Sequence, residues 1–176
     1  MQHEIIVKPL TRQKFKPFGD IIEADDREET VTINDGFATR YHDLARVDIN
    51  EAEGRPLINI FRGRPRPLPL TIHMMERHHL ASQAFIPLHN KPFVIVVASP
   101  GNAVGSRDLF AFIANGSQGV NYARGVWHFP LLVLSEEQDF IVIDRGGDGN
   151  NCEELYFDKG ETCVLKLQDD QACNHS

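Results

Sequence analysis

The sequence contains few cysteines and no long apolar run, and both absences are informative. Its three cysteines, Cys152, Cys163 and Cys173, fit neither a CxxC pair nor a zinc-binding spacing. An odd number of cysteines without a signal peptide indicates free thiols in a reducing compartment, so we expect a cytoplasmic protein. The longest apolar stretch, residues 93–98, is far shorter than the roughly 20 residues that a membrane-spanning helix requires.

Basic residues are outnumbered by acidic ones, and this balance bears on binding partners. The chain has 18 Lys and Arg against 25 Asp and Glu, which gives a formal net charge of −7. A nucleic-acid or anionic-membrane binder requires the opposite sign, so we expect neither partner. The length of 176 residues and the 41% content of hydrophobic residues are typical of one globular domain, and we expect residues 1–176 to form a single domain.

Short apolar stretches separated by turn residues predict strands along most of the chain. No segment shows the 3.6-residue periodicity of a helix over a dozen residues. Many short strands punctuated by turns indicate an all-β sandwich or barrel. The expected strands cover residues 3–8, 18–23, 29–33, 37–41, 57–61, 93–98, 109–113, 131–134, 140–144 and 162–167.

Local signals add detail to this pattern. Thr11 is suited to cap a short helical turn that ends at Phe15. Asn34-Asp-Gly36 lies between two expected strands and predicts a hairpin turn. Residues 93–98 are apolar throughout and predict a fully buried central strand. The alternating prolines of residues 64–69 cannot donate ladder hydrogen bonds, so this segment is either an extended connector or an edge strand.

Several of the histidines lie in two segments that also contain other potential ligands. On a strand, residues two apart share a face, which places Glu76 and His78 together, and Gln83 begins the next expected strand. In the second segment, Gly125 predicts a tight turn that directs His128 from the strand that follows. Imidazole and oxygen ligands suit a divalent transition metal, but the same groups can perform metal-free acid–base chemistry. Each histidine could also be an ordinary surface or hydrogen-bonded core residue.

The spacing of these residues resembles the two motifs of the cupin family. Those motifs read His-x-His-x3–4-Glu and, further along the chain, Pro-x-Gly-x2-His. This sequence has Glu76 in place of the first histidine, Gln83 in place of the glutamate and Ala123 in place of the proline. Glutamine is a weaker metal ligand than a carboxylate, so the sequence leaves the presence of a metal open.

Arginine outnumbers lysine by 12 to 6, and three arginines stand at alternate positions. Arg62, Arg64 and Arg66 share one face of an extended chain, where they form either a solvated positive edge or a fork that binds a small carboxylate. Four other arginines are rival anchors for a carboxylate: Arg40, Arg77, Arg124 and Arg145.

Eight segments, in the same order along the chain, resemble the ureidoglycolate lyase family. The resemblance covers about residues 4–157 and leaves out the C-terminal tail. Each segment alone is a weak signal, but eight in order are specific. The segments are Arg40–Leu44, Pro69–His73, Glu76–His78, Gln83–Pro87, Phe93–Ala98, Asn115–Tyr122, Gly125–His128 and Ile143–Gly147.

The resemblance implies a fold and a reaction. The fold would be a cupin-like (RmlC-like) double-stranded β-helix barrel with one or two short helices, usually assembled as a homodimer. The protein would be a carbon–nitrogen lyase of allantoin and purine breakdown, which splits (S)-ureidoglycolate into glyoxylate and urea. We expect no organic cofactor, and a divalent metal of the nickel, manganese or zinc type is a further expectation.

Cleavage of this substrate requires a base for its hydroxyl proton, an acid for the departing urea nitrogen and an anchor for its carboxylate. We expect His128 to be the base and His78 to be the acid or a metal ligand. Glu76 would orient these groups or bind the metal. If a metal is bound, its ligands would be Glu76, His78, Gln83 and His128. The expected substrate-binding residues are Arg62, Arg64, Gln83 and Tyr122.

Three rival functions stay open at this point. A hydrolase acting on the same substrate would release ammonia and carbon dioxide with glyoxylate, and it would need a firmly held metal to activate water. A non-enzymatic cupin-like module would bind a small ureido acid without the pair of proton-transfer groups. A metal-dependent dioxygenase or isomerase could also use this fold, because a fold alone does not determine function.

Overall fold

The computed structural model of the chain describes residues 2–158 and 160–167 and is almost entirely β. Its one α-helix is α1 (Arg12–Phe15), and short 3-10 turns cover Asn34–Gly36 and Glu51–Glu53. The strands are β1 (Gln2–Pro9), β2 (Gly19–Ile22), β3 (Thr30–Ile33), β4 (Ala38–Tyr41), β5 (Arg55–Gly63), β6 (Leu70–Ile72), β7 (Met74–His78), β8 (Gln83–Pro87), β9 (Phe93–Ala98), β10 (Phe110–Ala114), β11 (Gly119–Tyr122), β12 (Trp127–His128), β13 (Leu132–Val133), β14 (Gln138–Gly146), β15 (Cys152–Tyr156) and β16 (Thr162–Lys166).

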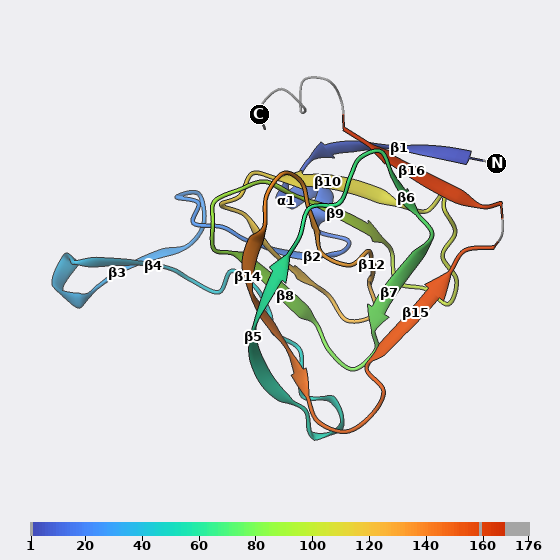
Figure 1. Cartoon of the computed structure of the whole chain (residues 1–176). Coiled ribbons are helices and arrows are strands. Elements are labelled where there is room, and N and C mark those ends of the chain that lie inside the picture. Colours follow the sequence, from blue (N-terminus) through green and yellow to red (C-terminus); the bar gives the residue numbers. More distant parts are fainter. Residues whose placement is uncertain (1, 159, 168–176) are drawn as a thin grey trace.

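Two sheets form the body of the molecule (Figure 1). The larger sheet has the strand order β15-β7-β12-β9-β10-β1-β16-β6, and β13 also pairs with β9. The smaller sheet has the order β2-β11-β8-β14-β5. The larger sheet curls toward the smaller one, and buried apolar side chains from both sheets form one cluster between them. The expected all-β, cupin-like barrel is therefore confirmed.

Strand β9 confirms the prediction of a fully buried central strand. All six of its residues are buried, and successive side chains point to opposite faces of the sheet. Its odd-numbered residues pack in the cluster between the two sheets, where Phe93 meets Phe140 of β14 with ring centroids 5.0 Å apart. Its even-numbered residues pack in a second cluster on the other face of the larger sheet, with Trp127 and Leu165. One strand thus contributes to both cores.

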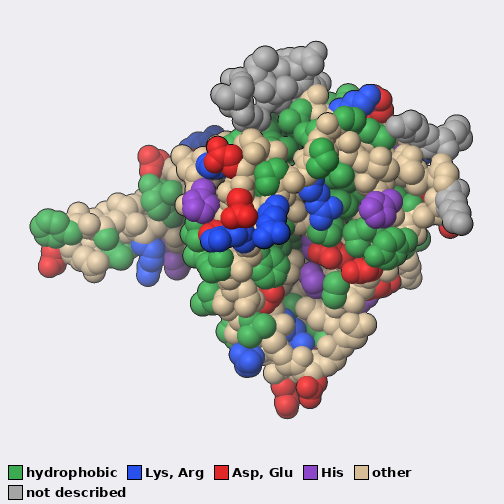
Figure 2. Space-filling view, in the orientation of Figure 1, with side chains coloured by type: hydrophobic (Ala, Val, Ile, Leu, Met, Phe, Trp, Pro, Cys, Tyr) green, Lys and Arg blue, Asp and Glu red, His purple; other side chains and the backbone are tan. Residues whose placement is uncertain are grey.

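The predicted hairpin around Asn34–Gly36 is confirmed, but its second strand begins one residue later than expected. Strands β3 and β4 pair antiparallel as a separate two-stranded sheet, and the hairpin projects from the body (Figures 1 and 2). Asn34 and Asp35 both have a φ of 54°, and Gly36 has a φ of 93°, so the chain reverses through left-handed residues. Phe37 was expected in the strand but precedes it, and 93% of its surface is exposed.

Two further local predictions have definite outcomes. Thr11 caps α1, because its side-chain oxygen accepts a hydrogen bond from the Lys14 backbone N–H at 3.4 Å. Residues 64–69 form a connector between β5 and β6 and are not a strand, which decides between the two alternatives for the proline-rich segment.

Some strands do not stand out in the sequence. Strand β15 reads Cys-Glu-Glu-Leu-Tyr and is an edge strand of the larger sheet, so its polar side chains lie on exposed surface and give no apolar run. Strand β11 has only four residues, and it begins with Gly119 because the backbone of β8 leaves no room there for a side chain. Pairing with neighbours, which sequence periodicity does not report, stabilises both strands.

Two of the three cysteines lie in the described residues, and both are free thiols: Cys152 is exposed and Cys163 is buried. Cys173 lies in the C-terminal segment outside the described residues. Within residues 2–158 and 160–167, no helix has the length and apolar character needed to cross a membrane.

Candidate functional site

The larger sheet brings a glutamate and two histidines together. Strands β7 and β12 pair antiparallel with His128 directly opposite Glu76, so both side chains lie on one face, and His78 follows on the same face two residues later. The predicted tight turn at Gly125 is confirmed: its φ is +76°, and its backbone N–H donates a hydrogen bond of 2.8 Å to the carbonyl of His78. This bond ties the turn before His128 to the end of β7.

Gln83 joins the cluster from the smaller sheet. It is buried at the start of β8, where it pairs with Tyr122 of β11. The His78 Nε2 atom lies 3.1 Å from Gln83 Oε1, which accepts its hydrogen bond. The structure therefore brings together all four residues that sequence spacing selected as possible ligands, and it places them between the two sheets.

His128 is the most enclosed member of the cluster, with 1% of its surface exposed. Its ring stacks on Tyr122 with centroids 4.4 Å apart and an interplanar angle of 11°. Its Nδ1–H donates to the carbonyl of Val126 at 3.1 Å, and this bond leaves Nε2 as the unprotonated nitrogen of the neutral ring. Nε2 lies 3.4 Å from Glu76 Oε1.

The donor set fits a divalent metal ion. One ligand atom from each of Glu76, His78 and His128 can be chosen so that all lie within 4.8 Å of one another. The His128 lone pair and a carboxylate oxygen of Glu76 face each other as two acceptors, an arrangement that a proton or a cation between them would stabilise. The bond from His128 Nδ1 to a backbone carbonyl is also the outer contact that metal-binding histidines commonly make.

Burial and charge act together on the titratable groups of the cluster. The pKa of His78 is lowered chiefly because burial disfavours its charged form, and the charge of His128 acts in the same direction. Burial alone would raise the pKa of Glu76, but the hydrogen bond and charge that a protonated His128 would supply, with the charge of a protonated His78, bring it below its ordinary value. Burial, with the Glu76 charge, raises the pKa of Tyr122 far above its ordinary value. At neutral pH the cluster therefore holds a carboxylate and a neutral His78.

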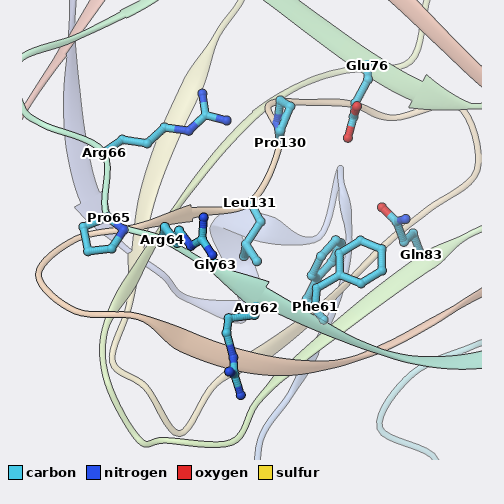
Figure 3. A pocket seen from close by; sticks show the side chains of 11 residues that line it. Phe61, Arg62, Gly63, Arg64, Pro65, Arg66, Glu76, Gln83, Pro130 and Leu131 are labelled. Carbon is cyan, nitrogen blue, oxygen red and sulfur yellow. The ribbon is translucent and has the colours of Figure 1, made fainter.

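A pocket of about 600 Å³ reaches Glu76 and Gln83 of this cluster (Figure 3), while His78 and His128 do not line it. Its lining combines Glu76 and Gln83 with apolar side chains and with the arginines of the proline-rich connector. The lining residues are Phe61, Arg62, Gly63, Arg64, Pro65, Arg66, Glu76, Gln83, Phe85, Pro130 and Leu131. The alternating arginines thus lie on the same pocket as the candidate ligands.

The three pocket arginines differ in their contacts. Arg62 forms two hydrogen bonds of 2.7 and 2.8 Å with the carboxylate of Asp139, and in Figure 3 its side chain extends away from Glu76. Arg64 lies 3.4 Å from Glu137 and is largely exposed. Arg66 stacks over the ring of Phe129 with a separation of 5.1 Å. The space-filling view shows the same pattern of basic side chains beside acidic ones (Figure 2).

The rival arginines are not among the residues that line this pocket. Arg77 stacks over Trp127 and pairs with Glu153 at 2.8 Å, on the face of β7 opposite to Glu76. Arg124 pairs with two acidic residues, and buried Arg145 donates only to backbone carbonyls. Arg40 lies in the projecting hairpin strand β4.

Asp144 is the polar residue of the site that sequence reasoning gave no role. It lies on β14 behind Gln83, and Asn59 Nδ2 of β5 donates to its Oδ1 at 3.0 Å. Burial raises its pKa, against the effect of hydrogen bonds from Gln83 and Asn59. A usable signal was present: Phe140, Val142 and Asp144 alternate, so an inward-facing strand pattern continues into a carboxylate.

The fold and the cluster define the class of protein: a cupin-like barrel with a histidine–glutamate cluster beside an arginine-lined pocket. Comparison with known proteins identifies the family. A family model described as ureidoglycolate lyase matches residues 2–164, and the chain belongs to that family.

Individual relatives agree with this assignment. The chain is 49% identical over 162 residues to a protein named ureidoglycolate lyase from Pseudomonas syringae pv. syringae (strain B728a), covering 92% of this chain and 95% of that protein. It is 53% identical over 148 residues to a ureidoglycolate lyase from Burkholderia mallei (strain NCTC 10229), covering 84% and 86%. A structure of RmlC from Streptococcus suis aligns with 55% of this chain and 46% of that chain, at 9% identity and a TM-score of 0.40.

Proposed function

We propose that this protein is a ureidoglycolate lyase, which splits (S)-ureidoglycolate into glyoxylate and urea. The observation that carries the proposal is the buried His128, whose Nε2 lone pair faces Glu76, a residue that lines the same pocket as the three arginines. Membership of the ureidoglycolate lyase family supports the choice of substrate.

The reaction determines which groups the site must provide. Ureidoglycolate carries a hydroxyl and a ureido nitrogen on one carbon, next to a carboxylate. When a base removes the hydroxyl proton, the carbonyl of glyoxylate forms and the bond from carbon to nitrogen breaks. The departing nitrogen must gain a proton, because an amide anion is a poor leaving group. One base, one acid and one carboxylate anchor therefore suffice, and no water is consumed.

The cluster can supply the base and the acid. We assign His128 Nε2 as the acceptor of the hydroxyl proton, because its other nitrogen is committed to the Val126 carbonyl. The imidazolium formed in this way lies 3.4 Å from Glu76, whose negative charge stabilises it. His78 in its protonated form is the proposed donor to the urea nitrogen, and its lowered pKa makes that form a stronger acid. Gln83 and Tyr122 are proposed to contact the ureido group.

Arginines at the rim are the proposed anchor for the carboxylate of the substrate. Their alternate spacing pointed to Arg62, Arg64 and Arg66 as a possible fork, and all three line the pocket. Because Asp139 holds the Arg62 guanidinium in two hydrogen bonds, Arg62 can bind a carboxylate only by sharing or exchanging that partner. Replacing each arginine by alanine and comparing the KM values would rank the three.

A divalent metal of the nickel, manganese or zinc type is part of the proposal. Glu76, His78 and His128 would hold it, with Gln83 as a weaker fourth ligand. His128 Nε2 would then be a ligand and not the base, so the metal-bound and metal-free forms are alternative versions of the site. When bound, it would act as a Lewis acid that stabilises the alkoxide of the substrate. We further propose that the protein works in the cytoplasm as a homodimer.

The test measures urea, ammonia and glyoxylate released from racemic ureidoglycolate by chelator-treated protein, against an enzyme-free blank. The blank is needed because the substrate can decompose unaided. Urea formed in step with glyoxylate above the blank supports the lyase. Ammonia in place of urea would show a hydrolase. Absence of both products with and without added divalent metal would refute the lyase and favour the non-enzymatic binding module.

A further inference from the structure

We propose that two copies of this chain pair through the outer face of the smaller sheet, with the β3–β4 hairpin of each copy packed against the other copy. This inference rests on the homodimer of the proposed function and deepens it, because it identifies the surface and the segment that form the dimer. Three observations carry it: an exposed apolar sheet face, a hairpin without a core, and the charges at the two ends of β5.

The outer face of the smaller sheet is covered with isoleucines. Its inner face packs in the cluster between the two sheets through Phe85, Phe140 and Val142, so the residues that alternate with these point outward. The register aligns the outward isoleucines of three neighbouring strands, which are Ile58 and Ile60 of β5, Ile141 and Ile143 of β14, and Ile86 of β8. None of the five is buried, and Ile58 and Ile60 are 77% and 58% exposed. Soluble monomers rarely expose a contiguous apolar face of this kind, so it indicates an interface.

The β3–β4 hairpin has no core of its own. Among the described strands, β3 and β4 pair only with each other, and none of residues 29–42 is buried. Phe37, next to the turn, is 93% exposed. A two-stranded hairpin in isolation is marginally stable in water, so this one requires a surface to pack on. It projects on the side of the molecule where β14 and β5 lie (Figure 1).

A second copy of the chain is the partner that fits both surfaces. A two-fold dimer uses the same patch of each copy, so each chain supplies one hairpin and one isoleucine face and receives the same pair from its partner. A stable interface takes about 20–30 residues from each side. The 14 residues of 29–42 supply a large part of this number, and the outward residues of β5, β14 and β8 bring the total into the range.

The charges beside β5 are complementary in such a dimer. Glu51 and Glu53 precede the strand, Arg62 and Arg64 lie at its other end, and all four are exposed. An antiparallel arrangement of two copies of β5 places the acidic end of one opposite the basic end of the other, and Arg55 is the one basic residue at the acidic end. Several of these groups already pair with opposite charges of their own chain, so the charges set the orientation and the isoleucines supply the affinity.

Sedimentation of the full chain over a range of protein concentrations tests the surface. Wild type should have the mass of two chains. Ile58→Lys should weaken the dimer by at least about a hundredfold, because a two-fold interface contains the changed residue twice. Ile6→Lys is the matched control: Ile6 is 57% exposed on β1 of the larger sheet, and its replacement should leave the dimer unchanged. Both changes are at exposed positions, so thermal unfolding should show two folded variants.

Hydrogen exchange tests the hairpin. The amides of residues 29–42 should be protected in the wild-type dimer and should exchange at least about tenfold faster in Ile58→Lys, although that substitution lies on another element. In Ile6→Lys they should stay protected. Phe37→Asp, which changes the hairpin itself, should also weaken the dimer.

The proposal is overturned by a monomeric wild type, by an Ile58→Lys dimer of wild-type affinity, or by hairpin amides that stay protected in a monomeric variant. None of these measurements uses substrate. A dimer that releases no urea would therefore refute the lyase and leave this surface standing, whereas a monomer that releases urea would refute the pairing and leave the lyase standing.

Discussion

Replacing His128 by asparagine tests the assignment of the base. Asparagine keeps a short polar group near the Val126 carbonyl but has no atom at the place of Nε2, the nitrogen that lies 3.4 Å from Glu76. The variant should therefore bind substrate in a pocket with the same rim and lack the acceptor for the hydroxyl proton.

The size of the effect follows from the usual contribution of proton transfer. General acid–base catalysis contributes about 10²–10⁴-fold, and a hundredfold loss corresponds to about 2.7 kcal/mol in the barrier. Nε2, 3.4 Å from Glu76 Oε1, is the atom that would take the proton, so its loss should lower kcat by at least a hundredfold.

The assay is the rate of urea release, corrected for the blank, for wild type, His128→Asn and His79→Asn. His79 directly follows β7 and forms a half-exposed pair with Glu153, and its replacement should leave kcat unchanged. Thermal unfolding measures whether His128→Asn is folded. We expect a folded variant, because the lost stacking on Tyr122 contributes only about 0.5–1.5 kcal/mol. Full activity in a folded His128→Asn variant would refute the assignment.

Three further predictions follow from the same contacts. Glu76→Gln should lower kcat at least tenfold. Because the two groups act as a unit, the double variant with His128→Asn should lose little more kcat than His128→Asn alone, and a double-mutant cycle of kcat measures this. The free energy of unfolding should decrease as pH falls below about 6.5, because His78 takes up a proton in the unfolded chain more readily than in the folded protein, where burial lowers its pKa. Urea titrations of wild type at several pH values should show this dependence on pH, and His78→Gln should reduce it. Arg145→Met should lower the free energy of unfolding by about 3 kcal/mol, because the buried guanidinium donates hydrogen bonds to the carbonyls of Glu51, Ala52 and Asp148. Denaturant unfolding measures this loss, and an unchanged midpoint would contradict the prediction.

The core of the site was predictable from the sequence because strand geometry is simple. Residues two apart on a strand share a face, which brought Glu76 and His78 together, and a glycine turn before a short strand directed His128 to them. The buried central strand was equally clear, because its six residues are all apolar. Both predictions used local periodicity alone.

Other parts of the site depend on contacts that local periodicity does not contain. The bonds between Arg62 and Asp139 join residues 77 positions apart, through the pairing of β5 with β14. The sequence selected Arg62 as a free anchor because it did not reveal that partner. Asp144 gained its place behind Gln83 in the same way, from the register between β14 and β8.

Strand β9 links the stability of the site to that of the whole barrel. Its two faces support different cores, and its Val97 pairs directly with His128 on β12. Melting either core would expose one side of this strand and weaken the other core as well, so the two should unfold in one cooperative transition. His128, the proposed base, is attached to this shared strand. Heat should therefore abolish catalysis and compact structure at the same temperature, with no inactive but folded form between them.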